Sequence, residues 1–357
     1  NATNVTIDNV TATAANYTVN VAASAPNAVV AIKNSTLNGL CTVNVSAAGA
    51  NVTVVGSTVN CNDNNTTVGE SYAALSLNKE AVGGSIVATN STINVTDGSD
   101  SMKGRNSAEN GTVTINGSTE GVFVMVAVIT YEGSTDYHSF PSLAKAVEFA
   151  KAGDVVTLIS DVTVAQPVVI NKSVTLNGNG KTLTSTAGRA INVDCEGNVG
   201  IKNLTINASG ERAINVIQKP ANVTIENVTA TAANYTVNVA GSAANAVVAI
   251  SNSNLTGLNV VNVAAPGSNV TINGGTFEGQ VWVHCVDDSA KLTINGGTFA
   301  PATSGDASSV FVNNAGKKAE LAITGGTFTT KIGANDAAAL AGAITGGTFS
   351  EAAKNGT

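Results

Sequence analysis

The sequence predicts an all-β solenoid, a fold in which one coil of short strands is stacked many times. A long internal repeat is the first reason, because residues 4–59 recur 218 residues later as 222–277, with 41 of 56 positions identical by direct count. A shorter period is the second, since similar segments begin at residues 198, 222, 245, 269 and 291, spaced 24, 23, 24 and 22 residues apart. Composition is the third: 36 Gly and only 4% aromatic residues favour short strands and tight turns over helices.

Each coil is predicted to hold three strands of alternating apolar residues. The third strand recurs in successive coils, which predicts one inward row made of Val193, Val216, Val239, Val263 and Val283. The residue just before each of the first four valines is Asn, and we expect this position to point outward, with its amides hydrogen-bonded along the stack. A second Asn row is expected at a turn, formed by Asn198, Asn222, Asn245 and Asn269.

The later coils carry a repeated Gly-Gly-Thr-Phe motif. It predicts an aromatic row inside the solenoid, made of Phe277, Phe299, Phe328 and Phe349. The two glycines before each Phe are expected to form the sharp corner that turns the ring inward.

One short helix is predicted within the β pattern. Its apolar residues follow at helical spacing, with Pro141 in the first turn and Gly153 as the stop; they are Leu143, Ala146, Val147 and Ala150. We expect this stripe to cover the open first coil of a second solenoid; a membrane-binding role would call for a basic face that the helix lacks. The predicted organisation is a first β-helix segment at 1–128, which is the tail of a repeat unit, a linker and capping helix at 129–153, and a second β-helix segment at 154–357.

Charge and hydropathy narrow the range of partners. A net charge of −7 with 17 scattered Lys and Arg argues against nucleic acid. No apolar run approaches the roughly 18 to 20 residues of a membrane helix, so no membrane span is expected. The sequence predicts neither a cofactor nor a metal site. Since Asn1 already lies inside a coil and no signal segment precedes it, we expect a mature product or a fragment of a longer tandem array.

Three sequence motifs carry a resemblance to a known family. The string SLAKAVEFAKAGDVVTLISDVTV, followed by LNGNGKTLT and later by GGTF corners, resembles right-handed parallel β-helix modules of the pectate-lyase-like superfamily, as found in repetitive bacterial surface proteins. The resemblance covers essentially the whole chain. It implies a right-handed parallel β-helix, secretion to the cell surface and a carbohydrate-rich setting, and it transfers no catalytic residue.

Candidate catalytic residues follow from the same resemblance, which implies Ca²⁺-binding carboxylates beside a basic residue in lyases and paired Asp with His in hydrolases. Asp287 and Asp288, after His284, form the one such cluster in the sequence. The Gly-His-Gly and Arg-x-Lys companions are missing, so we interpret the Asp pair as a turn and expect no enzyme. A polysaccharide lyase or hydrolase remains the less favoured alternative.

An aromatic pair is the candidate ligand-binding feature. Trp282 takes the outward position that is Asn in earlier coils, and Phe311 takes the same position one coil later. Two exposed rings in neighbouring coils would form a platform for sugars, together with His284, Asp287 and Asp288. The alternative is that the loop at 300–307 folds over the rings and buries them.

Two cysteines are candidates for a disulfide. Cys41 and Cys61 fall at comparable positions of adjacent coils, where stacked Cα atoms about 5 Å apart would allow a bond. The long insertion after Cys61 blurs its register, so a pair of free thiols is the equal alternative.

Three function classes follow. The first is a non-enzymatic extracellular structural protein that associates with itself end to end into a filament; the sequence pattern favours it because an open coil exposes unpaired strands. The second is an adhesin that binds cell-surface or host glycans. The third is a polysaccharide-active enzyme.

Overall fold

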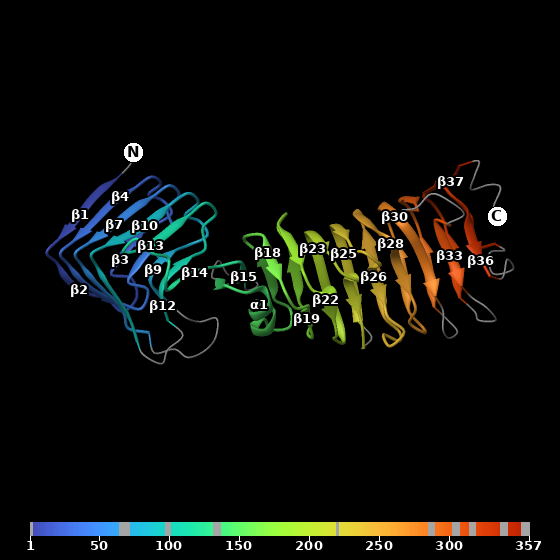
Figure 1. The fold of residues 1–357 in the computed structure, drawn as a ribbon, viewed down its shortest axis with the longest axis horizontal. Helices are drawn as coiled ribbons and strands as arrows, with labels where there is room; N and C mark the ends of the chain where they lie inside the picture. Colours follow the sequence, from blue (N-terminus) through green and yellow to red (C-terminus); the bar gives the residue numbers. More distant parts are fainter. Residues whose placement is uncertain are drawn as a thin grey trace. The chain divides into compact units, whose positions relative to one another are not determined.

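The computed structural model is a parallel β-solenoid with one short helix (Figure 1). It describes residues 3–63, 72–96, 101–130, 137–218, 221–284, 290–301, 308–313, 319–335 and 342–350. The chain divides into two compact units, the first formed by 1–128 with 136–149 and the second by 129–135 with 150–357. The linker boundaries at 129 and 153 remain a prediction.

The first unit contains three parallel sheets, so each coil contributes three strands as the sequence predicts. The first sheet contains β1 (Asn4–Asp8), β4 (Val29–Lys33), β7 (Asn51–Val55), β10 (Ser85–Thr89) and β13 (Thr112–Ile115). The second contains β2 (Thr11–Thr13), β5 (Thr36–Gly39), β8 (Thr58–Cys61) and β11 (Thr92–Val95). The third contains β3 (Val19–Val21), β6 (Val43–Val45), β9 (Ala73–Leu77), β12 (Met102–Asn106) and β14 (Val122–Val124).

The second unit continues the same parallel pattern, but several strands run through a corner and serve two faces. These long strands are β23 (Gly197–Ala208), β25 (Ala221–Thr231), β28 (Ser253–Val263) and β30 (Gly275–His284). The strands that precede or separate them are β17 (Val155–Leu158), β18 (Val162–Val164), β19 (Val168–Ile170), β20 (Thr175–Asn177), β21 (Thr182–Ser185), β22 (Arg189–Val193), β24 (Arg212–Val216), β26 (Tyr235–Val239), β27 (Val247–Ser251) and β29 (Asn269–Ile272). The strands that follow are β31 (Lys291–Ile294), β32 (Thr298–Ala300), β33 (Val310–Asn313), β34 (Glu320–Ile323), β35 (Thr327–Phe328), β36 (Ile332–Ala334) and β37 (Thr348–Phe349).

The helix α1 (Leu143–Phe149) is shorter than the predicted segment and begins after Ser142, whose Oγ lies 3.5 Å from the Lys145 amide. Pro141 therefore precedes the helix and is not in its first turn. The helix groups with the first unit, together with β16 (Tyr137–Phe140). The expectation that it covers the first coil of the second solenoid stays a prediction. Strand β15 (Ala127–Thr130) crosses the boundary between the units.

The predicted inward Val row is confirmed, and the predicted Phe row stacks as expected, with its first three rings fully buried and Phe349 half-buried. The five valines from Val193 to Val283 are register partners in successive coils and are fully buried. In the Phe row, ring centroids are 4.8, 4.8 and 5.0 Å apart and the rings lie within 11° of parallel. The corner glycine before each ring has a positive φ, and a Cβ on Gly275 would lie 2.0 Å from the Ser253 carbonyl oxygen. The second glycine of each pair is therefore required for this corner.

The Asn rows differ in part from the prediction. Asn215, Asn238 and Asn262 each donate to the Asn one coil earlier at 3.0, 2.7 and 2.7 Å, so the amide row exists. These three side chains are buried, at 0%, 3% and 5% exposure, and not outward in solvent as expected. The predicted turn row is interrupted, because Asn222 pairs with Val247, and Asn245 lies two residues earlier in a turn with φ 61°.

Candidate functional site

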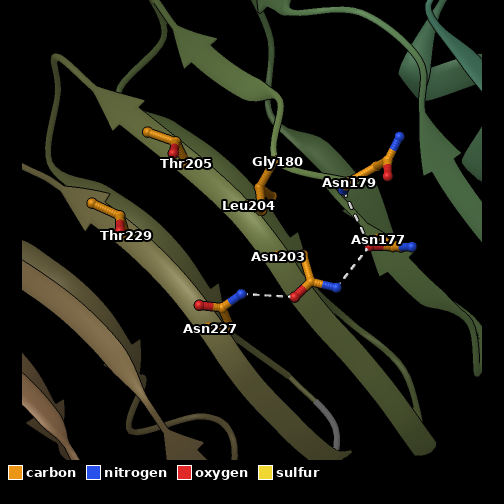
Figure 2. Close-up of a pocket in the computed structure, with 8 residues that line it drawn as sticks. All are labelled: Asn177, Asn179, Gly180, Asn203, Leu204, Thr205, Asn227 and Thr229. Carbon is orange, nitrogen blue, oxygen red and sulfur yellow. Dashed lines mark hydrogen bonds between the residues drawn. The ribbon is translucent and has the colours of Figure 1, made fainter.

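A polar groove lies on the outer surface of the second unit, over β20, β23 and β25 (Figure 2). Its cavity volume is about 400 Å³, and its lining is Asn177, Asn179, Gly180, Asn203, Leu204, Thr205, Asn227 and Thr229. All eight residues are uncharged, and all but Gly180 and Leu204 present an amide or a hydroxyl group. The groove therefore offers hydrogen bonds without a fixed charge.

The groove arises from a difference in corner length between adjacent coils. Four residues separate Asn177 from Thr182 in one coil, whereas two separate their partners Lys202 and Thr205 in the next. The shorter corner turns at Asn203, which has a left-handed backbone with φ 52°. The longer corner, at 178–181, passes close to the shorter one and needs glycine there. A Cβ on Gly178 would lie 2.6 Å from the Asn203 carbonyl oxygen.

Side-chain amides along the groove are hydrogen-bonded to one another. Asn227 donates to the Asn203 Oδ1 at 2.9 Å, and Asn203 donates to the Asn177 Oδ1 at 3.2 Å (Figure 2). The backbone amide of Asn179 donates to the same Asn177 oxygen at 3.1 Å. This row fixes the amides in one orientation, so the groove presents oriented donors and acceptors of the kind that bind hydroxyl-rich ligands.

Sequence reasoning missed this groove. Its signal was the string Leu-Asn-Gly-Asn-Gly-Lys, which is two residues longer than its counterpart in the following coil. Without a known register, such an addition reads as an ordinary turn.

The predicted aromatic pair is brought together. Trp282 and Phe311 are register partners in β30 and β33, and both are half-buried. The His284 ring lies 4.3 Å from the Trp282 ring, centroid to centroid, with a 40° angle between them. Beyond Phe311 the row continues with Gly333, where an added Cβ would lie 3.0 Å from the Phe311 ring. The two rings thus share a surface that ends on a residue without a side chain.

The remaining predicted site residues have different outcomes. Asp287 and Asp288 lie outside the described residues, as does most of the loop at 300–307. Cys41 and Cys61 are buried free thiols, so the disulfide alternative is not realised. The reason is register, because Cys61 is stacked on Gly39 and its Sγ donates to the Leu40 carbonyl oxygen at 2.9 Å.

Shifted pKa values occur away from the groove and the aromatic pair. Burial raises the pKa of Cys61 and the pKa of Tyr137. Burial also acts to raise the pKa of Glu80, but hydrogen bonds and charge from Lys79 outweigh it and lower this pKa overall. Cys61 ends β8, whereas Glu80 lies in the turn after β9 and accepts from the Tyr137 hydroxyl of β16 at 3.1 Å. We interpret them as structural.

Two other kinds of site are absent from the described ranges. No group of three or more His, Cys, Asp or Glu residues is arranged to hold a metal ion there. No helix in that part of the chain is long and apolar enough to cross a membrane.

Comparison with known proteins gave no match: no family model, curated protein or solved structure matches this chain. Function is therefore argued from the geometry alone.

Proposed function

We propose that this chain is a non-enzymatic structural repeat protein of an extracellular surface that associates with itself through an exposed coil edge. The repeat supplies an internal comparison for this edge. Strand β1 has the sequence Asn-Val-Thr-Ile-Asp, and the equivalent part of β25 has Asn-Val-Thr-Ile-Glu. The same residue types in the same fold therefore occur twice, 218 positions apart.

Strand β1 and the equivalent part of β25 differ in whether a preceding coil covers them. In β25 the edge pairs with β23 of the preceding coil, and Val223 and Val228 are 2% and 1% exposed. Their counterparts Val5 and Val10 are 41% and 39% exposed, and an apolar groove opens beside Val5, Val19 and Val30. Unpaired parallel strands beside exposed apolar residues recruit further strands, which a preceding repeat of the same protein or a second copy of this chain would supply. The observation that carries the proposal is this difference between equivalent valines.

Self-association is tested by sedimentation of the chain over a micromolar dilution series. We expect concentration-dependent assembly that Val5→Lys reduces. Val169→Lys is the matched control, because Val169 is 47% exposed but belongs to β19 of the second unit and not to this edge. A chain that stays monomeric throughout, or equal assembly by both variants, would contradict the proposal.

The non-enzymatic part has its own test. Incubation with acidic and neutral polysaccharides, with and without Ca²⁺, is expected to give no cleavage products. Cleavage that disappears in Asp287→Ala or Asp288→Ala would establish an enzyme instead.

Glycan binding is the second candidate function, and the pairing of Trp282 with Phe311 favours it. Sugar rings stack on aromatic faces, and two half-buried rings in adjacent coils form a continuous apolar surface. Trp282 is the one tryptophan of the sequence, so its fluorescence reports directly on occupancy. We expect oligosaccharide to shift this fluorescence and Phe311→Ala to weaken the effect at least tenfold, whereas Phe123→Ala, an exposed ring in the first unit, leaves it unchanged. No response to a panel of neutral and acidic oligosaccharides would exclude this candidate.

A further inference from the structure

The second unit carries two arginines stacked directly on one another. Arg189 opens β22 and Arg212 opens β24, and they are register partners in adjacent coils. Neighbouring strands lie about 4.8 Å apart, so two positive charges face the same surface at close range. Like charges directly opposite each other in a sheet destabilise it. Such a pair therefore calls for a compensating negative group.

The protein supplies only part of this compensation. The Glu211 Oε2 lies 3.9 Å from the Arg189 Nε and also 3.9 Å from an Arg212 terminal nitrogen. Both distances exceed hydrogen-bond length, so a single carboxylate is shared between two guanidinium groups without binding either closely. The local charge of the three side chains is one positive unit.

One donor at this position has no acceptor. The Arg212 Nε is buried and makes no hydrogen bond within the described structure. The rest of the side chain is held in place, because Arg212 lies over the Tyr235 ring, with its guanidinium carbon 5.5 Å from the centroid. Tyr235 is the next member of the same row, as the register partner of Arg212. The Arg212 guanidinium group therefore lies against an aromatic ring with one buried donor unpaired.

The backbone also brings the two coils close together here. The Arg212 amide donates to the Gly188 carbonyl oxygen at 3.0 Å, and a Cβ on Gly210 would lie 2.5 Å from the Gly188 Cα. Glycine at 210 thus allows the two arginine-bearing turns to approach each other. Side-chain exposures of 39% for Arg189 and 21% for Arg212 leave both groups reachable from solvent.

We propose that Arg189, Arg212 and Tyr235 form an oxyanion-binding site, which takes a sulfate-type group either free in solution or carried on a saccharide. Planar guanidinium groups bind such oxygens through paired hydrogen bonds. The bound group would accept from the solvent-exposed parts of both guanidinium groups and separate the two positive charges, while the Arg212 Nε stays buried. This site is independent of both the self-association edge and the Trp282 surface, so it stands or falls separately from them.

The first test measures binding by calorimetry with sodium sulfate, against sodium chloride at equal ionic strength. We expect Arg212→Gln to weaken sulfate binding at least tenfold. Lys33→Gln removes the same charge from an exposed residue in the first unit and should leave the affinity unchanged. Glu211→Gln removes the competing carboxylate and should tighten binding, whereas Glu120→Gln, an exposed residue of the first unit, should not.

A second arm distinguishes the source of the anion. A sulfated oligosaccharide that binds more tightly than inorganic sulfate identifies a glycan-borne group, and equal affinity identifies the free anion; both outcomes support the site. Its desulfated form should not compete. Sulfate also stabilises proteins in general by exclusion from their surface. Equal effects of sulfate on wild type and Arg212→Gln, or no change in affinity with Glu211→Gln, would overturn the proposal.

Discussion

Removing one inner ring of the four-membered Phe row is the sharpest test of the packing scheme. Phe299 is fully buried, and its ring lies 4.8 Å from both Phe277 and Phe328 at angles of 9° and 8°. Phe299→Ala removes the buried ring and leaves a cavity, which costs about 3–5 kcal/mol in such settings. Phe299→Leu keeps most of the apolar volume but loses both ring contacts, each worth about 0.5–1.5 kcal/mol. We therefore expect the Leu variant to lose about 1–3 kcal/mol.

The assay is denaturant unfolding followed by Trp282 fluorescence. Trp282 lies in β30, the strand that also carries Phe277, so it reports on the coil against which Phe299 packs. Phe123→Ala serves as the control because that ring is 46% exposed, and its loss should change the free energy of unfolding little. If Phe299→Ala destabilises no more than Phe123→Ala, or if the Ala and Leu variants are equal, the inward stacked row is wrong.

Three further predictions concern polar and titrating groups. Asn238→Ala should destabilise the second unit by about 2–4 kcal/mol, because it leaves two buried amide groups of the row unpaired; denaturant unfolding measures the loss. Cys41 and Cys61 should resist alkylation in the folded chain at pH 8 and react after unfolding, since both are buried and the raised pKa of Cys61 lowers its thiolate fraction; mass spectrometry counts the labels. Glu80 has a lowered pKa in the folded chain, so its stabilising contribution is present above the ordinary Glu pKa of 4.5. This contribution is lost as the pH falls through the lower pKa of the folded chain. Thermal unfolding between pH 6 and pH 3 measures the loss of stability.

Each of these has a matched comparison. Asn94→Ala, in an exposed hydrogen-bonded pair with Asn60, should cost far less than Asn238→Ala, and equal costs would contradict the buried row. A folded chain two mass units lighter than the reduced form would show a disulfide and not free thiols. Glu80→Gln should remove that part of the acid dependence, and an unchanged pH profile would rule out the carboxylate as its source.

The inward rows were predictable because they depend on period alone. Val216 and Val239 must share a face in any regular stack, since a one-residue slip would move the entire apolar set to the other side of the strand. Turn positions do not carry this constraint. Asn245 resembles the start of a strand in the sequence, but the strand begins at Val247 because the preceding turn takes two residues more than the repeat suggests. The same kind of slip placed Cys61 over Gly39 and not over Cys41.

The polar groove could not be predicted for a related reason. The groove forms because a corner of four residues is stacked on a corner of two residues in the next coil. This difference in length is a relation between two coils and cannot be seen in either coil alone. The burial of Asn215 and Asn238 was equally hidden, because alternation along a strand separates inward from outward positions but does not state how much of the outward face is covered.

In a stack of coils, a row of side chains that hydrogen-bond to one another has a different consequence for function from a row in which such bonds are missing. In the buried third-strand row, each Asn amide donates to the one before it, so this row satisfies its own hydrogen bonds and, unlike the partly exposed Asn row of the polar groove, is closed to a ligand. Where the residue type changes, this mutual pairing stops: Asn262 precedes Trp282 in the row, and its Oδ1 is buried and makes no hydrogen bond within the described structure. The stacked arginines are the charged equivalent, since Arg212 has a positive partner on one side and an aromatic ring on the other. In both cases the unpaired group lies where one residue type gives way to another along the row. A regular row pairs its members with one another. At a break in the row, a polar group has no like neighbour to bind.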